Sequence, residues 1–206
     1  MQQMAEQMVR GQFQVIAEAA RGCDLIVAAG ALQIATRSIA EMQDSAYIFA
    51  AYCPAVLPSQ YYPPSKMAGP HSFSLSPEEN LQLWKEDEES FERFGPTLNE
   101  ERARTGLGPV ASVRGHMFTE RPWLAADPVL APVFPLAGMQ VVTSGAWMLT
   151  DETPLPEALE DFLAAGEPPV YLGFGSMRAS DQTSHVLIEA VRALGLGAIL
   201  SPGWAN

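Results

Sequence analysis

Apolar residues in the first fifty positions switch between helical spacing and short continuous runs. Ala5, Val9, Phe13, Ile16 and Ala20 recur at steps of three and four, which predicts an amphipathic helix. The same reading predicts a strand over 24–29, a helix over 32–39 and a second strand over 46–51. Helices and strands that alternate over short connections are typical of an α/β layer with a parallel sheet.

The regular pattern stops between Cys53 and Pro77. Repeated prolines and the pair Tyr61-Tyr62 predict a long irregular loop beyond the carboxyl end of a strand. Long loops in compact domains are often functional, and open α/β sheets bind ligands at this edge. Tyr61 and Tyr62 are therefore candidate ligand contacts, and a proline-rich surface loop without a ligand is the alternative.

A new helix is predicted to begin at Ser76, because Pro77 suits its first turn and Glu79 completes a capping box. Gly95-Pro96 is expected to break it, and a further helical stretch then runs to Arg104. The predicted buried face of the helix that begins at Ser76 carries Leu81, Trp84 and Phe91. Up to residue 150 the sequence predicts strands over 117–119 and 139–146, with a packed connector over 123–130 between them.

The run Val170–Phe174 has the pattern of a buried parallel strand, because prolines precede it and glycines punctuate its end. Ser180 is a suitable N-cap for the helix that should follow. Backbone N–H groups at such a strand–turn–helix junction can bind a phosphate. Arg178 stands where a dinucleotide motif needs its third glycine, so these residues alone favour an ordinary βα turn over a phosphate site.

The polar segment Thr150–Pro156 is the best candidate for a linker, which predicts one domain over 1–150 and a second over 151–206. The second part offers two strands, over 170–174 and 197–200, with few elements to cover them. A parallel sheet needs cover on both faces. We therefore expect this part to be the less stable one, with possible self-association through an unpaired strand edge.

A net charge of -12 argues against nucleic acid or an anionic membrane as a partner. Nine of the acidic residues lie between Glu78 and Glu101 and are interpreted as a solvated helical face, so no metal site is predicted. Cys23 and Cys53 form no C-x-x-C motif. The N-terminus shows no apolar leader, and no apolar run is long enough for a membrane span, so a soluble cytoplasmic protein is expected.

Several segments together resemble the two-domain glycosyltransferases that use nucleotide-activated sugars, in particular those that glycosylate vancomycin-type glycopeptide aglycones. The segments follow one another nearly from end to end. They are residues 22–24, 53–64 with Pro-Ser-Gln-Tyr-Tyr-Pro-Pro, 121–130 with Arg-Pro-Trp-Leu-Ala-Ala-Asp-Pro-Val-Leu, 143–147 with Thr-Ser-Gly-Ala-Trp, 168–177 and 200–204. Each segment is unspecific by itself, and their shared order makes the resemblance strong.

The resemblance implies an α/β fold with two Rossmann-like parallel-sheet domains of GT-B type, both incomplete in this chain. It implies inverting hexosyl transfer from a nucleoside diphosphate sugar to a hydroxyl of a natural-product aglycone, without a further cofactor. Gly175 and Ser176 match the segment that approaches the donor diphosphate, and Trp204 matches a turn near the donor. Tyr61 and Tyr62 match the loop over the acceptor cleft.

The family's general base lies in a Gly-rich loop without a counterpart in this sequence, so the catalytic residue is unknown. His71, His116 and His185 are interpreted as structural or surface residues. The chain is therefore expected to be an inactive central fragment of a glycosyltransferase. The alternatives are a non-catalytic protein that binds an aglycone or a partner chain, and a nucleotide-dependent oxidoreductase, which the absent third glycine disfavours.

Overall fold

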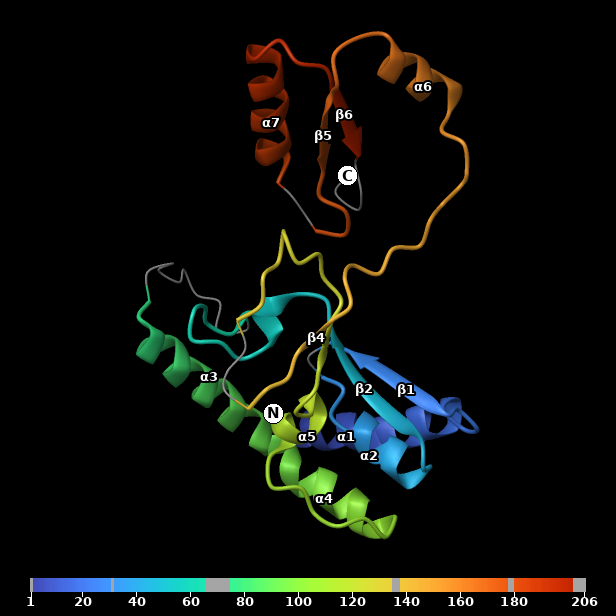
Figure 1. Ribbon diagram of the computed structural model, residues 1–206, viewed down its shortest axis with the longest axis vertical. Coiled ribbons are helices and arrows are strands. Elements are labelled where there is room, and N and C mark those ends of the chain that lie inside the picture. The colour runs from blue at the N-terminus through green and yellow to red at the C-terminus, as the bar shows by residue number, and fades with distance from the viewer. Residues whose placement is uncertain (1, 31, 66–74, 135–137, 178–179, 202–206) are drawn as a thin grey trace. The chain divides into compact units, whose positions relative to one another are not determined.

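A computed structural model describes residues 2–30, 32–65, 75–134, 138–177 and 180–201 (Figure 1). The chain divides into two compact units, Met1–Met148 and Leu149–Asn206, and each is described by itself. In the described part of the chain, no helix combines the length and the apolar character that crossing a membrane requires.

The first unit is built on a four-stranded parallel sheet (Figure 1). Its strands are β1 (Leu25–Ala29), β2 (Ala46–Ala51), β3 (Trp123–Leu124) and β4 (Val142–Thr143), in that spatial order. β1 and β2 pair over five residues, whereas β3 and β4 each contribute two. Because the strands are parallel, their carboxyl ends lie along one edge of the sheet.

Helices α1 (Gln2–Ala19), α2 (Thr36–Met42) and α4 (Gly95–Arg104) pack on one another, and α2 also packs against β1 and β2. Between them and the sheet lies a closely packed apolar core. Its fully buried members include Val9, Ile34, Ile39, Phe49, Leu57, Phe94, Leu98, Met117 and Leu124. This core brings together segments more than a hundred residues apart in the sequence and fixes the sheet edge that carries the loop after β2.

Helix α3 (Pro77–Phe91) begins as the sequence predicts. The Ser76 hydroxyl accepts a hydrogen bond from the Glu79 backbone N–H, and the Glu79 carboxylate accepts one from the Ser76 N–H, which completes the capping box. At its end α3 passes through the 3₁₀ turn η3 (Glu92–Phe94) into α4, so the predicted break at Gly95-Pro96 is confirmed. Trp84 and Phe91 are buried, but Leu81 is exposed, contrary to the prediction.

Three predictions for the middle of the chain are wrong or too long. Residues 117–119 were expected to form a strand, but Met117 and Phe118 belong to helix α5 (Val113–Phe118), which Ser112 caps through a hydrogen bond from the Gly115 N–H. The expected connector over 123–130 contains β3, and the expected strand over 139–146 is reduced to β4. Short apolar runs fit a strand and a buried helix equally well, and the packing decides between them.

The second unit contains α6 (Glu157–Ala164), β5 (Val170–Gly173), α7 (Asp181–Ala193) and β6 (Ala198–Ser201). β5 and β6 form a separate two-stranded parallel sheet, which confirms the prediction of two sheets. Among the described apolar residues of this unit, Val191 alone is buried. The incomplete cover predicted for the strands is therefore confirmed: 170, 172 and 199 are half-buried, and 200 is exposed.

We expect the β5 amides to exchange hydrogen faster than those of β2, because β2 ends in the buried run 49–51 and β5 has no buried residue. An apolar side chain left in water forfeits about 1.5 to 3 kcal/mol, and 1.4 kcal/mol corresponds to about tenfold in an opening equilibrium. Hydrogen exchange of the monomeric chain, read by mass spectrometry, measures the difference. Equal protection of the β5 and β2 amides would contradict the expectation that the less buried strand opens more readily.

Candidate functional site

The irregular loop after β2 leaves the carboxyl edge of the sheet and carries Tyr61 and Tyr62. It starts with the 3₁₀ turn η1 (Pro54–Val56). The Tyr61 side chain is 61% exposed, and its ring meets the ring of Phe134 edge to face, with the centroids 5.1 Å apart. Tyr61 therefore presents an aromatic surface to solvent at the edge where α/β sheets bind ligands.

Tyr62 has a different role from its neighbour. Its hydroxyl donates to the backbone oxygen of Pro54 at 2.9 Å, and its own backbone oxygen accepts from the Trp84 indole nitrogen at 2.7 Å. Burial raises the pKa of the Tyr62 hydroxyl. Both polar groups are thus used inside the protein, so Tyr62 shapes the loop rather than offering a free hydroxyl to a ligand.

Helix α3 anchors this loop at two points. Besides the Trp84 bond, the Asn80 side-chain amide donates to the backbone oxygen of Gln60 at 3.0 Å. Ser59 is fully buried, and its hydroxyl accepts from the backbone N–H of Tyr61 at 3.2 Å. This anchor was not predicted from the sequence, although a tryptophan on the predicted buried face of the helix directly after the loop was a usable signal.

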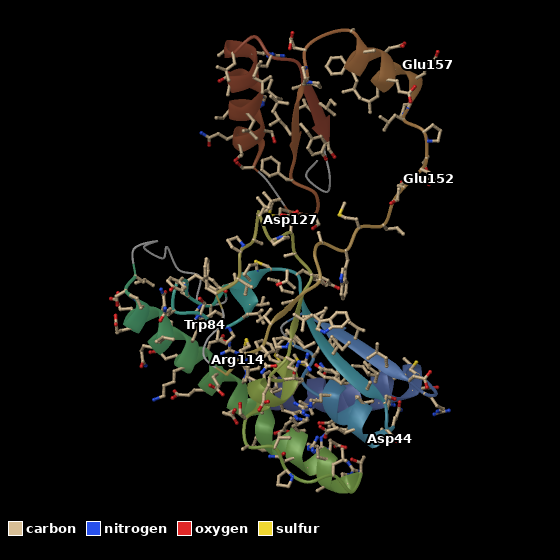
Figure 2. The ribbon with its side chains drawn as sticks, viewed as in Figure 1. Asp44, Trp84, Arg114, Asp127, Glu152 and Glu157 are labelled. Carbon is tan, nitrogen blue, oxygen red and sulfur yellow. The ribbon has the colours of Figure 1, made fainter. Side chains whose placement is uncertain are left out.

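The guanidinium of Arg114, a residue of α5, stacks on the ring of Trp84 (Figure 2). The guanidinium carbon lies 4.7 Å from the Trp84 ring centroid, and one guanidinium nitrogen lies 3.2 Å from the Asp87 carboxylate. Burial lowers the pKa of Arg114, and the Asp87 carboxylate opposes that effect. Its Nε and Nη2 have no hydrogen-bond partner among the described residues. A cavity of about 90 Å³, lined in part by Trp84 and Asp87, is roomy enough for water beside this pair.

The strand–turn–helix of the second unit carries the predicted donor residues. Gly175 has φ +56°, a value that L side chains rarely adopt, and the Met177 N–H closes the turn on the Phe174 oxygen at 3.0 Å. Gly175 and Ser176 are exposed. Ser180 caps α7 as predicted, and its hydroxyl accepts from the Thr183 N–H. The turn therefore combines an exposed hydroxyl with the positive end of a helix.

A hollow of about 230 Å³ lies between α7 and the carboxyl ends of β5 and β6. Its lining is mainly apolar, with two hydroxyls, and comprises Leu172, Phe174, Ser184, Leu187, Ile188, Leu200 and Ser201. Gly175 and Ser176 do not line it. Trp204, the third predicted donor residue, lies outside the described residues.

No family model matches the chain. Three of its curated relatives, all from Amycolatopsis orientalis, match the chain at 43 to 46% identity. Glycosyltransferase GtfE is 46% identical over 95% of this chain and 48% of its own length, and glycosyltransferase GtfC is 45% identical over 98% and 50%. The vancomycin aglycone glucosyltransferase is 43% identical over 95% of this chain and 48% of its own length. The chain is homologous to these glycosyltransferases along nearly its whole length.

The chain spans about half the length of the curated relatives it matches. The identity covers both units, and together with the two parallel sheets it confirms the α/β, GT-B type fold class predicted from the sequence. Tyr61, Tyr62, Gly175 and Ser176 lie within the described part of the matched chain, but their contacts with substrates stay predictions.

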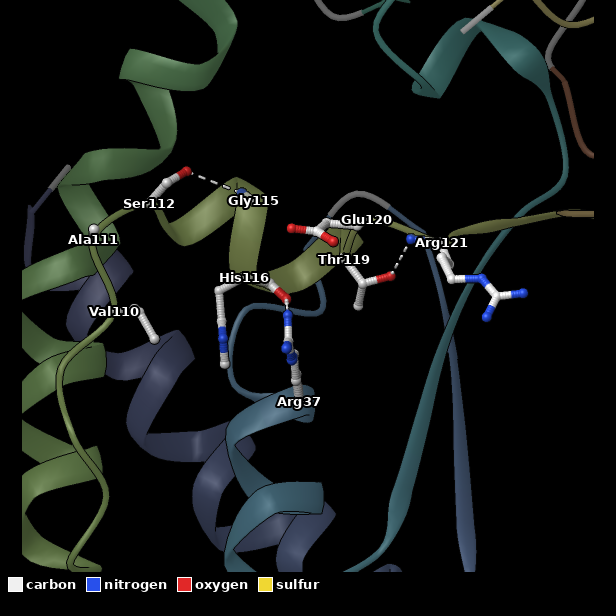
Figure 3. A pocket seen from close by; sticks show the side chains of 9 residues that line it. All are labelled: Arg37, Val110, Ala111, Ser112, Gly115, His116, Thr119, Glu120 and Arg121. Atoms are coloured by element: carbon white, nitrogen blue, oxygen red, sulfur yellow. Dashed lines mark hydrogen bonds between the residues drawn. The ribbon is translucent and has the colours of Figure 1, made fainter. Parts of the chain in front are cut away.

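His116 lies in a buried polar network of the first unit. Its Nε2 is 3.0 Å from the Ser38 hydroxyl and 3.3 Å from Arg102 Nη1, which also donates to the Ser38 hydroxyl and to Glu41. Arg37 donates to the His116 backbone oxygen at 2.9 Å (Figure 3). Burial lowers the pKa of His116 to about 4, and the Glu41 carboxylate opposes that effect.

These contacts make His116 a structural residue rather than a general base, in agreement with its interpretation from the sequence. It lines a broad hollow of about 670 Å³ at the amino-terminal side of β3, together with Arg37, Ser112 and Arg121 (Figure 3). That hollow is larger than the others described, yet it lies away from the carboxyl edge of the sheet, and its histidine nitrogen is engaged in the core. His185 is exposed on α7, and His71 lies outside the described residues.

Within the described ranges, no three His, Cys, Asp or Glu side chains lie together as metal ligands would. The acidic residues of α3 instead take part in local contacts, such as the ion pair of Asp87 with Arg114 and the hydrogen bond from Ser112 to Glu88. Cys23 and Cys53 are both free and exposed.

We expect His116 to make the protein less stable as the pH falls from about 6.5 to about 4. In that window the unfolded histidine binds a proton that the folded one excludes, so the free energy of unfolding decreases, by up to about 3 kcal/mol. His116→Gln should flatten this part of the profile, whereas His185→Gln, an exposed control, should not. Urea denaturation from pH 4 to 7 measures it, and parallel profiles for wild type and His116→Gln would contradict the expectation.

Proposed function

We propose that this chain is part of an inverting glycosyltransferase, which transfers a hexosyl group from a nucleoside diphosphate sugar to a hydroxyl of a glycopeptide-type aglycone. One observation carries the proposal: identity of 43 to 46% extends over at least 95% of the chain to three relatives named as glycosyltransferases. One of them is named for glucosyl transfer to the vancomycin aglycone. The positions that match donor and acceptor segments both fall inside the shared region.

The donor would bind at the turn after β5. Backbone N–H groups near Gly175, the Ser176 hydroxyl and the amino-terminal end of α7 are all suited to a diphosphate, which gains negative charge as the sugar departs. The exposure of Ser176 and the positive φ of Gly175 support this role, since the backbone can approach a ligand closely there. Trp204 would complete the donor side by resemblance alone.

The acceptor would bind beside the loop that follows β2. Tyr61 supports this proposal with its exposed ring, and Tyr62 contributes through the loop conformation that its two hydrogen bonds maintain. The general base is not assigned to any residue of this chain. We therefore propose that the chain by itself binds substrates without turnover.

Partners and setting follow from the same proposal. The nucleotide sugar and the aglycone would be the substrates, with no further cofactor and no nucleic acid. Two free, exposed cysteines suit a reducing cytoplasm. The poorly covered strands β5 and β6 could also support weak self-association through a sheet edge.

A chimera tests the proposed activity directly. In it, this chain replaces the matching segment of the vancomycin aglycone glucosyltransferase, which supplies the remaining half. We expect transfer of glucose to the vancomycin aglycone, detected by mass spectrometry. Ser176→Ala in the chimera should lower the rate about 10- to 100-fold, because a hydrogen bond to the charged leaving diphosphate is lost.

Glu189→Ala is the control, because Glu189 is exposed on α7 but lies well beyond the amino-terminal end of that helix. It should leave the rate unchanged. A chimera that folds and binds the aglycone but forms no product would contradict the proposed transfer and favour a non-catalytic binding protein. Equal rates for Ser176→Ala and Glu189→Ala would contradict the donor assignment alone.

A further inference from the structure

Three aromatic rings gather at the edge of the first sheet. Tyr52 directly follows β2, Trp123 belongs to β3 and pairs with Ala50, and Trp147 lies four residues beyond β4. The Trp147 ring meets Tyr52 at a centroid distance of 6.0 Å and an angle of 78°. It meets Trp123 at 6.4 Å and 79°, so Trp147 contacts both neighbours edge to face.

Trp147 is fixed in this position although 46% of it is exposed. Its indole nitrogen donates to the Ser144 hydroxyl at 2.9 Å, and that hydroxyl in turn lies 3.3 Å from the Leu124 backbone oxygen. The Ser144 N–H also donates to the Leu124 oxygen at 3.0 Å. The ring is therefore tied to β3 and β4 through Ser144 rather than left free on the surface.

Tyr52 extends the aromatic surface, because 60% of its side chain is exposed directly beyond the buried end of β2. Large apolar side chains that stay exposed while their position is fixed are typical of binding sites. The three rings carry no charge, and an aromatic face attracts the C–H edge of another ring. The chemistry of the cluster therefore fits an aromatic ring of a ligand better than a phosphate.

We propose that Tyr52 and Trp147, supported by Trp123, form an acceptor subsite that holds an aromatic ring of the aglycone. The inference rests on the proposed function and extends it to a second group of residues, separate from Tyr61. Ligands of parallel sheets bind beyond the carboxyl ends of the strands, which is where β2 gives way to Tyr52 and β4 to Trp147. These residues position the acceptor and take no part in proton transfer.

Titration of the chain with vancomycin aglycone, followed by calorimetry, tests the subsite. Trp147→Ala and Tyr52→Ala should each raise Kd about three- to tenfold, because each removes one ring contact. Tyr52→Phe keeps the ring and should bind nearly as well as wild type. Tyr171→Ala is the matched control, since Tyr171 is similarly exposed, at 66%, but lies on β5 in the second unit.

The alternative outcomes are separable. Unchanged Kd for Trp147→Ala and Tyr52→Ala, with weaker binding by Tyr61→Ala, would overturn the subsite and leave the proposed acceptor loop standing. No binding by the wild-type chain would overturn both. If sedimentation shows that the wild type self-associates and Trp147→Ala does not, while both bind the aglycone equally, the cluster is an interface between two copies and the subsite is wrong.

Discussion

The hydrogen bond from the Trp84 indole to the backbone oxygen of Tyr62 joins the irregular loop after β2 to helix α3, which buried contacts hold in place. Trp84 is buried, and Arg114 lies against its ring while pairing with Asp87 one turn further along α3. Separating Arg114 from Asp87 is costly, because each would become an unpaired charge in the protein interior, where water cannot solvate it. The loop has no strand hydrogen bonds of its own, so its conformation depends on its hydrogen bonds to α3.

This constraint explains why two adjacent tyrosines differ. The bond from Trp84 fixes the backbone of Tyr62, whose hydroxyl donates to the Pro54 oxygen, while the ring of the adjacent Tyr61 stays exposed beside Phe134. The aromatic surface at this sheet edge therefore depends on buried contacts beneath it. The second unit has no comparable support, because Val191 is the single buried apolar residue in its described part. Its turn at Gly175 is shaped by local backbone geometry instead.

Local chemistry was predictable from the sequence and tertiary pairing was not. Ser76 and Glu79 form their capping box within one turn, so four residues suffice to predict it. β3 consists of two residues that become a strand through pairing with Ala50 and Ala51, more than seventy positions away. Nothing local marks such a strand, and for the same reason the run at Met117 was interpreted as a strand rather than a buried helix.

The candidate site follows the same division. Tyr61, Gly175 and Ser176 stood out because prolines and glycines mark loops and turns. The anchor joins Trp84 to Tyr62, 22 positions earlier in the sequence, and the ring contact joins Trp147 to Tyr52, 95 positions earlier. Sequence patterns do not reveal contacts over such separations. An aromatic residue directly after a predicted buried strand was a signal for Tyr52, because it must leave the core at the edge where ligands bind.

The exchange of the tryptophan indole N–H groups with deuterated water, followed by two-dimensional NMR, tests the central role of the anchor most directly. Trp84→Phe and Trp147→Phe identify the two signals. The Trp84 indole proton, bonded to Tyr62 in a buried site, should exchange much more slowly than that of Trp147, which is bonded at the surface. Equally fast exchange of both protons would contradict a loop held by α3.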